Sequence, residues 1–185
     1  VSFDDGVHNT LAAARILEEF GMRGCFFLCP SIVGEKDPAK LERFCVERLQ
    51  FVPANFLDWD DVENLLARGH EIGGHTVSHV RMATLSEQTI DDEVGLCREL
   101  LQKRIGAVRH FAWPFGRFTD VTARTVDAVY QAGFETCASA ERGCHTVAHS
   151  GALRDLCLRR ETIVAGWPVR HSLFLMARSI KAAGP

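Results

Sequence analysis

The chain has 185 residues, of which 46% are hydrophobic and 24% are charged, and its formal net charge at pH 7 is −3. This length fits one domain with a substantial buried core, so we expect residues 1–185 to form a single domain. The slightly acidic balance, without a dense Lys/Arg run, argues against a nucleic-acid surface, and no apolar stretch approaches the ~18 residues that span a bilayer.

Short apolar runs alternate with helical periodicity in the first half of the chain. Four apolar residues spaced i, i+3, i+4 and i+7 predict the inner face of a helix ended by Gly21, namely Ala13, Ile16, Leu17 and Phe20. Asp58 is the expected N-cap of a second helix, which ends at Gly69. Strands are predicted at residues 1–3, 24–29 and 71–74, and an irregular segment at 30–57 with a short helix over 41–49.

The same alternation continues in the second half. Ser86 is predicted to cap a helix whose inner face is Ile90, Val94, Cys97 and Leu101. Thr119 is predicted to cap another helix, stopped by Gly133. Further strands are expected at 108–113, 134–138 and 156–164, and a last helix at 169–182. The whole pattern predicts an α/β fold of mostly parallel strands.

Seven cysteines form an odd set without the CxxC pairs of a zinc site. Most lie in apolar runs, which favours buried thiols over a disulfide framework and therefore a reducing, cytoplasmic compartment. The sequence begins at Val1, already inside the first predicted strand. We expect an N-terminus that has been trimmed, which leaves the presence of a signal peptide open.

Two groups of polar residues carry the chemistry. Asp4 and Asp5 follow the first strand, and His75 and His79 follow the strand at 71–74. Two imidazoles and one carboxylate are a common ligand set for a catalytic zinc-type ion, which leaves a position open for water. Consecutive residues on an extended chain point to opposite sides, so one aspartate can bind the ion while the other acts as a base. The four-residue spacing of the histidines puts both rings on one face if the segment is helical.

The positions of these groups along the chain strengthen the interpretation. The aspartates, His75 and the Pro114-Phe115-Gly116 turn each follow a predicted strand directly. In parallel α/β barrels, catalytic residues gather at the carboxyl ends of the strands. The sequence therefore predicts metal-assisted hydrolysis at this end of the sheet.

Three segments resemble, in order and spacing, the first three motifs of the polysaccharide deacetylases, the NodB-homology group of carbohydrate esterases that includes chitin deacetylases. They are Phe3-Asp4-Asp5-Gly6, the run from Gly69 to His79, and Phe111-Ala112-Trp113-Pro114-Phe115-Gly116. The resemblance covers roughly residues 1–140. It implies a distorted (β/α) barrel and a single catalytic domain that removes acetyl groups from an N-acetylated, sometimes O-acetylated, saccharide or glycoconjugate.

The resemblance also implies roles for individual residues. Asp5, His75 and His79 would bind one divalent metal ion, and Asp4 would be the base that takes a proton from the metal-bound water. Zinc is the first choice of ion, with cobalt, nickel, iron and manganese as alternatives. Trp113, Pro114 and Phe115 would line the substrate groove. The backbone N–H of Phe115 would help to hold the oxyanion, a contact typically worth ~2.7–4 kcal/mol of barrier.

Two departures from the family pattern concern the catalytic machinery. Ala112 stands where many members carry an Arg that orients the base. Arg160, on the predicted last strand, is the candidate to hold Asp4 in its place, with an ordinary surface or salt-bridged Arg as the alternative. The late Leu-x-His that supplies the general acid has no clear match, and His171 is the nearest candidate. His145 and His149 repeat the ligand spacing but lie in a polar loop, where a second metal site is not expected.

Two other functions remain open at this point. One is an amidase acting on a small non-sugar amide or cyclic ureide, because relatives with the same barrel open such rings. The other is a non-catalytic barrel that binds a metal or a carbohydrate. The presence of both aspartates and both histidines favours an enzyme. The sequence does not define the sugar or the oligomeric state.

Overall fold

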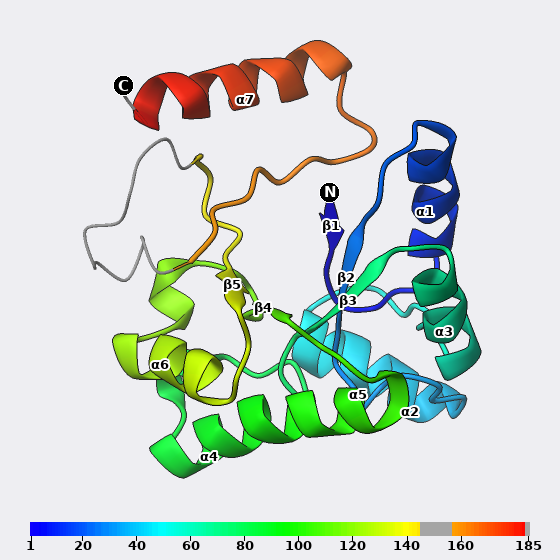
Figure 1. The fold of residues 1–185 in the computed structure, drawn as a ribbon, viewed down its shortest axis with the longest axis vertical. Coiled ribbons are helices and arrows are strands. Elements are labelled where there is room, and N and C mark those ends of the chain that lie inside the picture. The colour runs from blue at the N-terminus through cyan, green and yellow to red at the C-terminus, as the bar shows by residue number, and fades with distance from the viewer. Residues whose placement is uncertain (145–156, 184–185) are drawn as a thin grey trace.

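In a computed structural model, which describes residues 1–144 and 157–183, the strands form one sheet (Figure 1). Five parallel strands follow one another in chain order across the sheet, so each successive strand lies beside the one before. They are β1 (Ser2–Phe3), β2 (Cys25–Leu28), β3 (Glu71–Gly74), β4 (His110–Ala112) and β5 (Thr136–Ala138). The sheet curls into half of a barrel, and the predicted α/β barrel class is confirmed.

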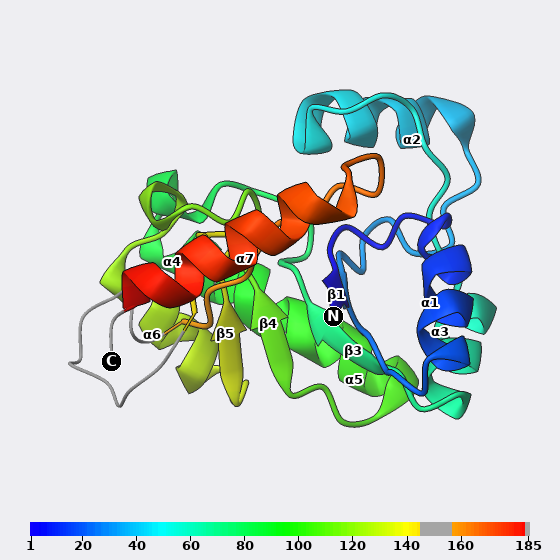
Figure 2. The same cartoon turned by 90° about the horizontal axis from the view of Figure 1, so that it is seen from above.

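Helices surround the sheet (Figures 1 and 2). The α-helices are α1 (Thr10–Glu19), α2 (Pro38–Arg43), α3 (Trp59–Ala67), α4 (Glu87–Asp91), α5 (Cys97–Ile105), α6 (Ala123–Gln131) and α7 (Val169–Ala183). Two segments are π-helical: η1 (Phe44–Leu49) continues α2, and η3 (Asp92–Leu96) joins α4 to α5. Short 3₁₀ turns are η2 (Met82–Thr84) and η4 (Phe118–Asp120). None of the helices described is long and apolar enough to cross a membrane.

Several sequence predictions of helix ends and faces are confirmed. The Asp58 side chain accepts from the backbone N–H of Asp61, which completes a capping box at the start of α3. Ser86 caps α4 in the predicted way, by accepting from the N–H of Thr89. The predicted inner face of the helical run from α4 to α5 is buried, with at most 4% of any of its side chains exposed: Ile90, Val94, Cys97 and Leu101.

The predicted inner face of α1 is wrong in part. Ile16 and Phe20 are 55% and 75% exposed, and the fully buried residue of this helix is Ala14. Leu11 is partly buried against the same core cluster. The helix therefore meets the core mainly through a small side chain, and Ile16 and Phe20 are directed outward.

Two boundaries in the second half also differ from the prediction. Thr122, not Thr119, caps α6 through reciprocal hydrogen bonds with Thr125, because residues Phe118–Asp120 form a 3₁₀ turn first. The predicted strand at 156–164 is reduced, over its described residues 157–164, to one parallel bridge between Leu158 and Ala138. After this bridge the Arg160 side chain turns toward β1, and residues 162–166 are exposed.

All seven cysteines are free thiols. Five of them are buried, as the sequence predicted for most: Cys29, Cys45, Cys97, Cys137 and Cys157. Burial raises the pKa of Cys97 to about 12, which keeps that thiol protonated and unreactive at neutral pH.

Candidate metal centre

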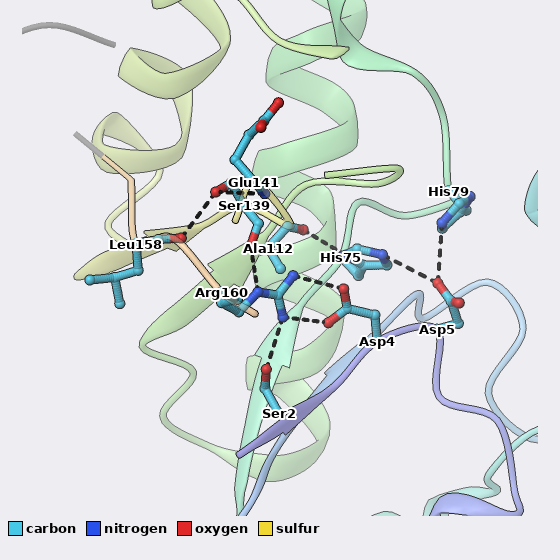
Figure 3. A network of polar contacts seen from close by, with 10 residues as sticks. All are labelled: Ser2, Asp4, Asp5, His75, His79, Ala112, Ser139, Glu141, Leu158 and Arg160. Atoms are coloured by element: carbon cyan, nitrogen blue, oxygen red, sulfur yellow. Dashed lines mark hydrogen bonds and ion pairs between the residues drawn. The ribbon is translucent and has the colours of Figure 1, made fainter. Parts of the chain in front are cut away.

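Three side chains converge where β1 and β3 end (Figure 3). Nε2 of His75 lies 3.3 Å from Oδ1 of Asp5, and Nε2 of His79 lies 3.1 Å from the same oxygen. Both histidines are buried, whereas 32% of the Asp5 side chain is exposed. The three residues predicted as ligands therefore meet at one point that is open to solvent on the Asp5 side.

Backbone carbonyls fix the orientation of both imidazoles. Nδ1 of His75 lies 2.6 Å from the carbonyl oxygen of Ala112, and Nδ1 of His79 lies 3.0 Å from that of Arg48. Because a carbonyl only accepts, each Nδ1 must carry the hydrogen and donate it. Each neutral ring then presents the lone pair of Nε2 toward Asp5, which is the tautomer that binds a metal.

The charges of the cluster respond to this geometry. Burial alone would raise the pKa of Asp5, but hydrogen bonds and charge interactions with His75 and His79 outweigh it and hold that pKa below its usual value. Burial likewise opposes a charged His75, yet the contact with Asp5 keeps the pKa of this imidazole above its usual value. The cluster therefore favours positive charge next to Asp5, which either a proton on His75 or a cation bound by the neutral rings would supply.

This donor set fits a divalent cation. One ligand atom from each of Asp5, His75 and His79 lies within 4.8 Å of the other two. With both Nδ1 atoms donating elsewhere, the remaining atoms are all acceptors, which a cation satisfies. Two imidazoles and one carboxylate are ligands typical of zinc, and three protein ligands leave a further position for water or substrate.

The loop that carries the histidines is not the helical turn that their spacing allowed. Thr76 and His79 have φ values of 60° and 55°, in the left-handed region, and Asp5 has a φ of 71°. Such a conformation costs of order 1–3 kcal/mol for a residue other than glycine. Strained backbone thus turns the ligands toward one another, and other contacts must maintain it.

Asp4 points to the other side of β1 and pairs with Arg160. The guanidinium donates from Nη1 to Oδ1 at 2.7 Å and from Nη2 to Oδ2 at 2.8 Å (Figure 3). Nε of Arg160 donates to the carbonyl oxygen of Ser139 at 2.6 Å, and Nη1 also donates to Oγ of Ser2 at 3.0 Å. The Arg160 side chain is 19% exposed, so the guanidinium is largely shielded from water, whereas the paired Asp4 carboxylate is 30% exposed.

The side chains of the third motif lie partly in the core and partly beside the histidines. Trp113 is 1% exposed and its indole N–H donates to the carbonyl oxygen of Arg117, so its side chain belongs to the core instead of the groove. Pro114 is buried as well. The Phe115 ring, in contrast, lies 4.9 Å from the His79 ring, and the guanidinium of Arg81 lies 4.2 Å from the centre of the Phe115 ring. Phe115 is therefore the residue of this motif whose side chain reaches the predicted ligands.

Sequence reasoning missed several residues that support the cluster. Ser2 could have been found, because it lies two residues before Asp4 and so on the same side of β1. Glu93 comes three residues after the buried Ile90, on the edge of the buried helix face, and it contacts the histidine loop. The Arg48 carbonyl has no sequence signal, because a backbone group is not marked by residue type.

Of the other histidines considered from the sequence, the structure places His171 outside this cluster. The His171 side chain is exposed on α7, and its ring lies 4.7 Å from the ring of Trp167. His145 and His149 lie outside the described residues. The described residues thus offer one group that could hold a metal ion, and it is the one formed by Asp5, His75 and His79.

Comparison of the sequence with protein-family models gives one family. The model described as polysaccharide deacetylase matches residues 1–137, which is most of the chain and includes all three motifs. No curated protein matches the chain in sequence.

Comparison with solved structures gives the same kind of fold. The deacetylase PplD of Streptococcus pyogenes, solved in complex with acetate, is similar with a TM-score of 0.72 and 18% identity, over 95% of this chain and 68% of that one. A de-N-acetylase from Aggregatibacter actinomycetemcomitans has a TM-score of 0.70 and 17% identity, and the match covers 95% of this chain and 73% of that one. BA3943 of Bacillus anthracis, a CE4 family pseudoenzyme, has a TM-score of 0.52 and 18% identity, and the match covers 74% of this chain and 41% of that one. At such identities the likeness establishes the fold only.

Proposed function

The chain belongs to the polysaccharide deacetylase family, and on that premise we propose that it is a metal-dependent hydrolase that removes acetyl groups from an N-acetylated saccharide or glycoconjugate. The bond broken would be a carbon–nitrogen bond other than a peptide bond. The observation that carries the proposal is the juxtaposition of two carboxylates with different partners. Asp5 faces two imidazoles, and Asp4 is held by Arg160 beside it.

The metal would be held by Asp5, His75 and His79, with zinc as the first choice. Bound there, it would supply Lewis-acid chemistry, lowering the pKa of water from 15.7 to about 7 and polarising the acetyl carbonyl. Asp4 would take the proton of the attacking water as a general base. A carboxylate has about four lone-pair positions and Arg160 occupies two of them, so each oxygen of Asp4 retains the capacity to accept a proton.

The remaining roles follow from position. Arg160 would fix the Asp4 carboxylate. It would take the place of the Arg that many family members carry at the position of Ala112. The Phe115 backbone N–H would donate to the oxyanion that forms when water attacks the acetyl carbon. Among the described residues His171 contacts Trp167 and not the cluster, so it is not assigned as the general acid. Protonated Asp4 would instead return the proton to the departing amine.

The exposure of the cluster favours a saccharide over the small cyclic ureides considered as an alternative. The side chains of Asp4 and Asp5 are 30% and 32% exposed, so both carboxylates face a surface that a chain-like substrate can reach. A small-molecule amidase would require a closed pocket around them. The non-catalytic alternative gains weight from a similar structure that is described as a pseudoenzyme, and the same assay decides between them.

The assay measures acetate release from N-acetylated chito-oligosaccharides by zinc-loaded and metal-stripped protein. We expect multiple turnovers with zinc, background rates after stripping, and recovery when zinc is restored. Opening of a hydantoin without acetate release would favour the amidase. Zinc binding with no hydrolysis of either substrate would favour the non-catalytic barrel.

The role of Arg160 gives a separate prediction. Arg160→Lys keeps a positive charge but loses the planar fork that holds both oxygens of Asp4, so the base is no longer fixed. We expect kcat to fall by about 10–100-fold, as is typical when an outer partner of a metal site is lost. Zinc affinity and KM should change little, because Arg160 contacts neither the ligands nor the predicted groove.

Arg15→Lys on the exposed side of α1 is the control, since it makes the same chemical change away from the site. An Arg160→Lys enzyme with the kcat of the unmodified protein would contradict the assigned role.

A further inference from the structure

The loop between the two histidine ligands is anchored by a residue from outside the recognised motifs. Glu93 lies in the π-helical segment η3, between α4 and α5. Its Oε2 accepts from the backbone N–H groups of Val77 and Ser78, at 2.8 and 3.0 Å, and its Oε1 accepts from the Ser78 hydroxyl at 2.7 Å. One carboxylate therefore receives three hydrogen bonds from two adjacent residues of this loop.

These three bonds fall within the strained part of the backbone. Val77 and Ser78 are the residues between Thr76 and His79, whose φ values of 60° and 55° are left-handed. By fixing both N–H groups between the two strained positions, the carboxylate opposes relaxation of the loop toward ordinary conformations. Relaxation would rotate His79 away from Asp5, because the His79 backbone itself has to change.

The placement of Glu93 in a π-helix supports a specific role. Wider turns of this kind occur frequently at functional sites. The backbone carbonyl of Glu93 also accepts from Val77 N–H, at 3.1 Å, so that side chain and main chain both reach the same amide. The helix is thus brought close enough to the loop for a short carboxylate bridge.

We propose that Glu93 is a positioning residue for the metal centre, which holds the strained loop so that His75 and His79 face Asp5 before the ion arrives. The inference rests on one part of the proposed function, namely that Asp5, His75 and His79 bind a metal ion. It makes zinc affinity, and not the fold, the property that depends on the Glu93 carboxylate.

The test measures the zinc dissociation constant of the full chain by competition with a chromogenic chelator. Glu93→Ala removes all three bonds, and we expect zinc to bind about 10–100-fold more weakly, as for other outer partners of metal ligands. Glu93→Gln keeps an oxygen for the two N–H groups, and the Ser78 hydroxyl can turn to accept from its amide. This variant should therefore retain most of the affinity. Glu99→Ala, on the exposed side of α5, is the matched control and should bind zinc normally.

Thermal unfolding of the metal-free proteins separates positioning from general stability. The backbone bond from Val77 N–H to the Glu93 carbonyl survives in Glu93→Ala, so we expect the metal-free variant to fold. Ser78→Ala removes a single bond and should weaken zinc binding in the same direction but less, which provides a test even if Glu93→Ala does not fold. Unchanged zinc affinity in both variants would overturn the proposal.

The outcome is independent of the substrate assay. If zinc binding weakens as expected while no acetylated saccharide is hydrolysed by the unmodified protein, the role of Glu93 stands and the proposed deacetylation fails. If deacetylation is observed but Glu93→Ala binds zinc as well as Glu93→Gln does, the proposed deacetylation stands and the role of Glu93 fails.

Discussion

Asp4→Asn is expected to lower kcat for acetate release by about 10²–10⁴-fold, the usual contribution of a positioned general base. Asparagine has nearly the same shape and can still accept a hydrogen bond from Arg160, but it cannot take a proton at neutral pH. Asp5, His75 and His79 are unchanged, so the variant should bind one zinc with nearly normal affinity. Steady-state kinetics combined with a zinc titration measures both properties on the same preparation.

The control is Asp60→Asn on the exposed surface of α3, which makes the same change in charge without touching the cluster. Its kcat should equal that of the unmodified enzyme. Near-normal turnover in Asp4→Asn would remove Asp4 from the role of base. Simultaneous loss of zinc would instead make it a ligand, and the division of labour between the two aspartates would be wrong.

His79→Ala is expected to abolish both zinc binding and turnover. The substitution removes one of the three proposed protein ligands and also the ring that packs against Phe115. In the unmodified protein, zinc at 100 times its dissociation constant should stabilise the fold by about 2.7 kcal/mol. For a chain of this size that raises the melting temperature by roughly 5–11 °C. We expect no such shift in His79→Ala, as measured by thermal unfolding with and without zinc.

His8→Ala serves as the control for His79→Ala, since His8 is a half-exposed residue with a distant contact to Asp61, 3.9 Å away. It should keep the full zinc-dependent shift. A zinc-dependent shift of the normal size in His79→Ala would show that the ion binds elsewhere.

The sequence predicted the parallel sheet and the composition of the cluster well because both depend on local patterns. Asp4 and Asp5 directly follow a short strand, and an extended chain there would already send their side chains to opposite sides. The left-handed φ of 71° at Asp5 was not predictable in this way. The structure has them facing different partners, Arg160 and the histidines. The buried face of α4 to α5 was also predictable, because apolar residues repeat there at helical spacing.

The features that were not predicted depend on contacts between distant segments. The strand expected at 156–164 has the composition of a strand, but a strand needs a partner along its length and the described part pairs only at Leu158. The histidine spacing allowed a helical turn, whereas the loop is held in left-handed conformations. Spacing gives the distance between two side chains only when the backbone between them is regular.

The central claim is that Asp5, His75 and His79 hold one divalent metal ion, and a crystal of the zinc-loaded protein tests it most directly. An anomalous difference map from data collected at the zinc edge should contain one strong peak at this cluster. The peak should lie about 2.0–2.2 Å from an oxygen of Asp5 and from Nε2 of both histidines. A map with no peak there, or with His75 or His79 directed into the core or toward bulk solvent, would contradict the account.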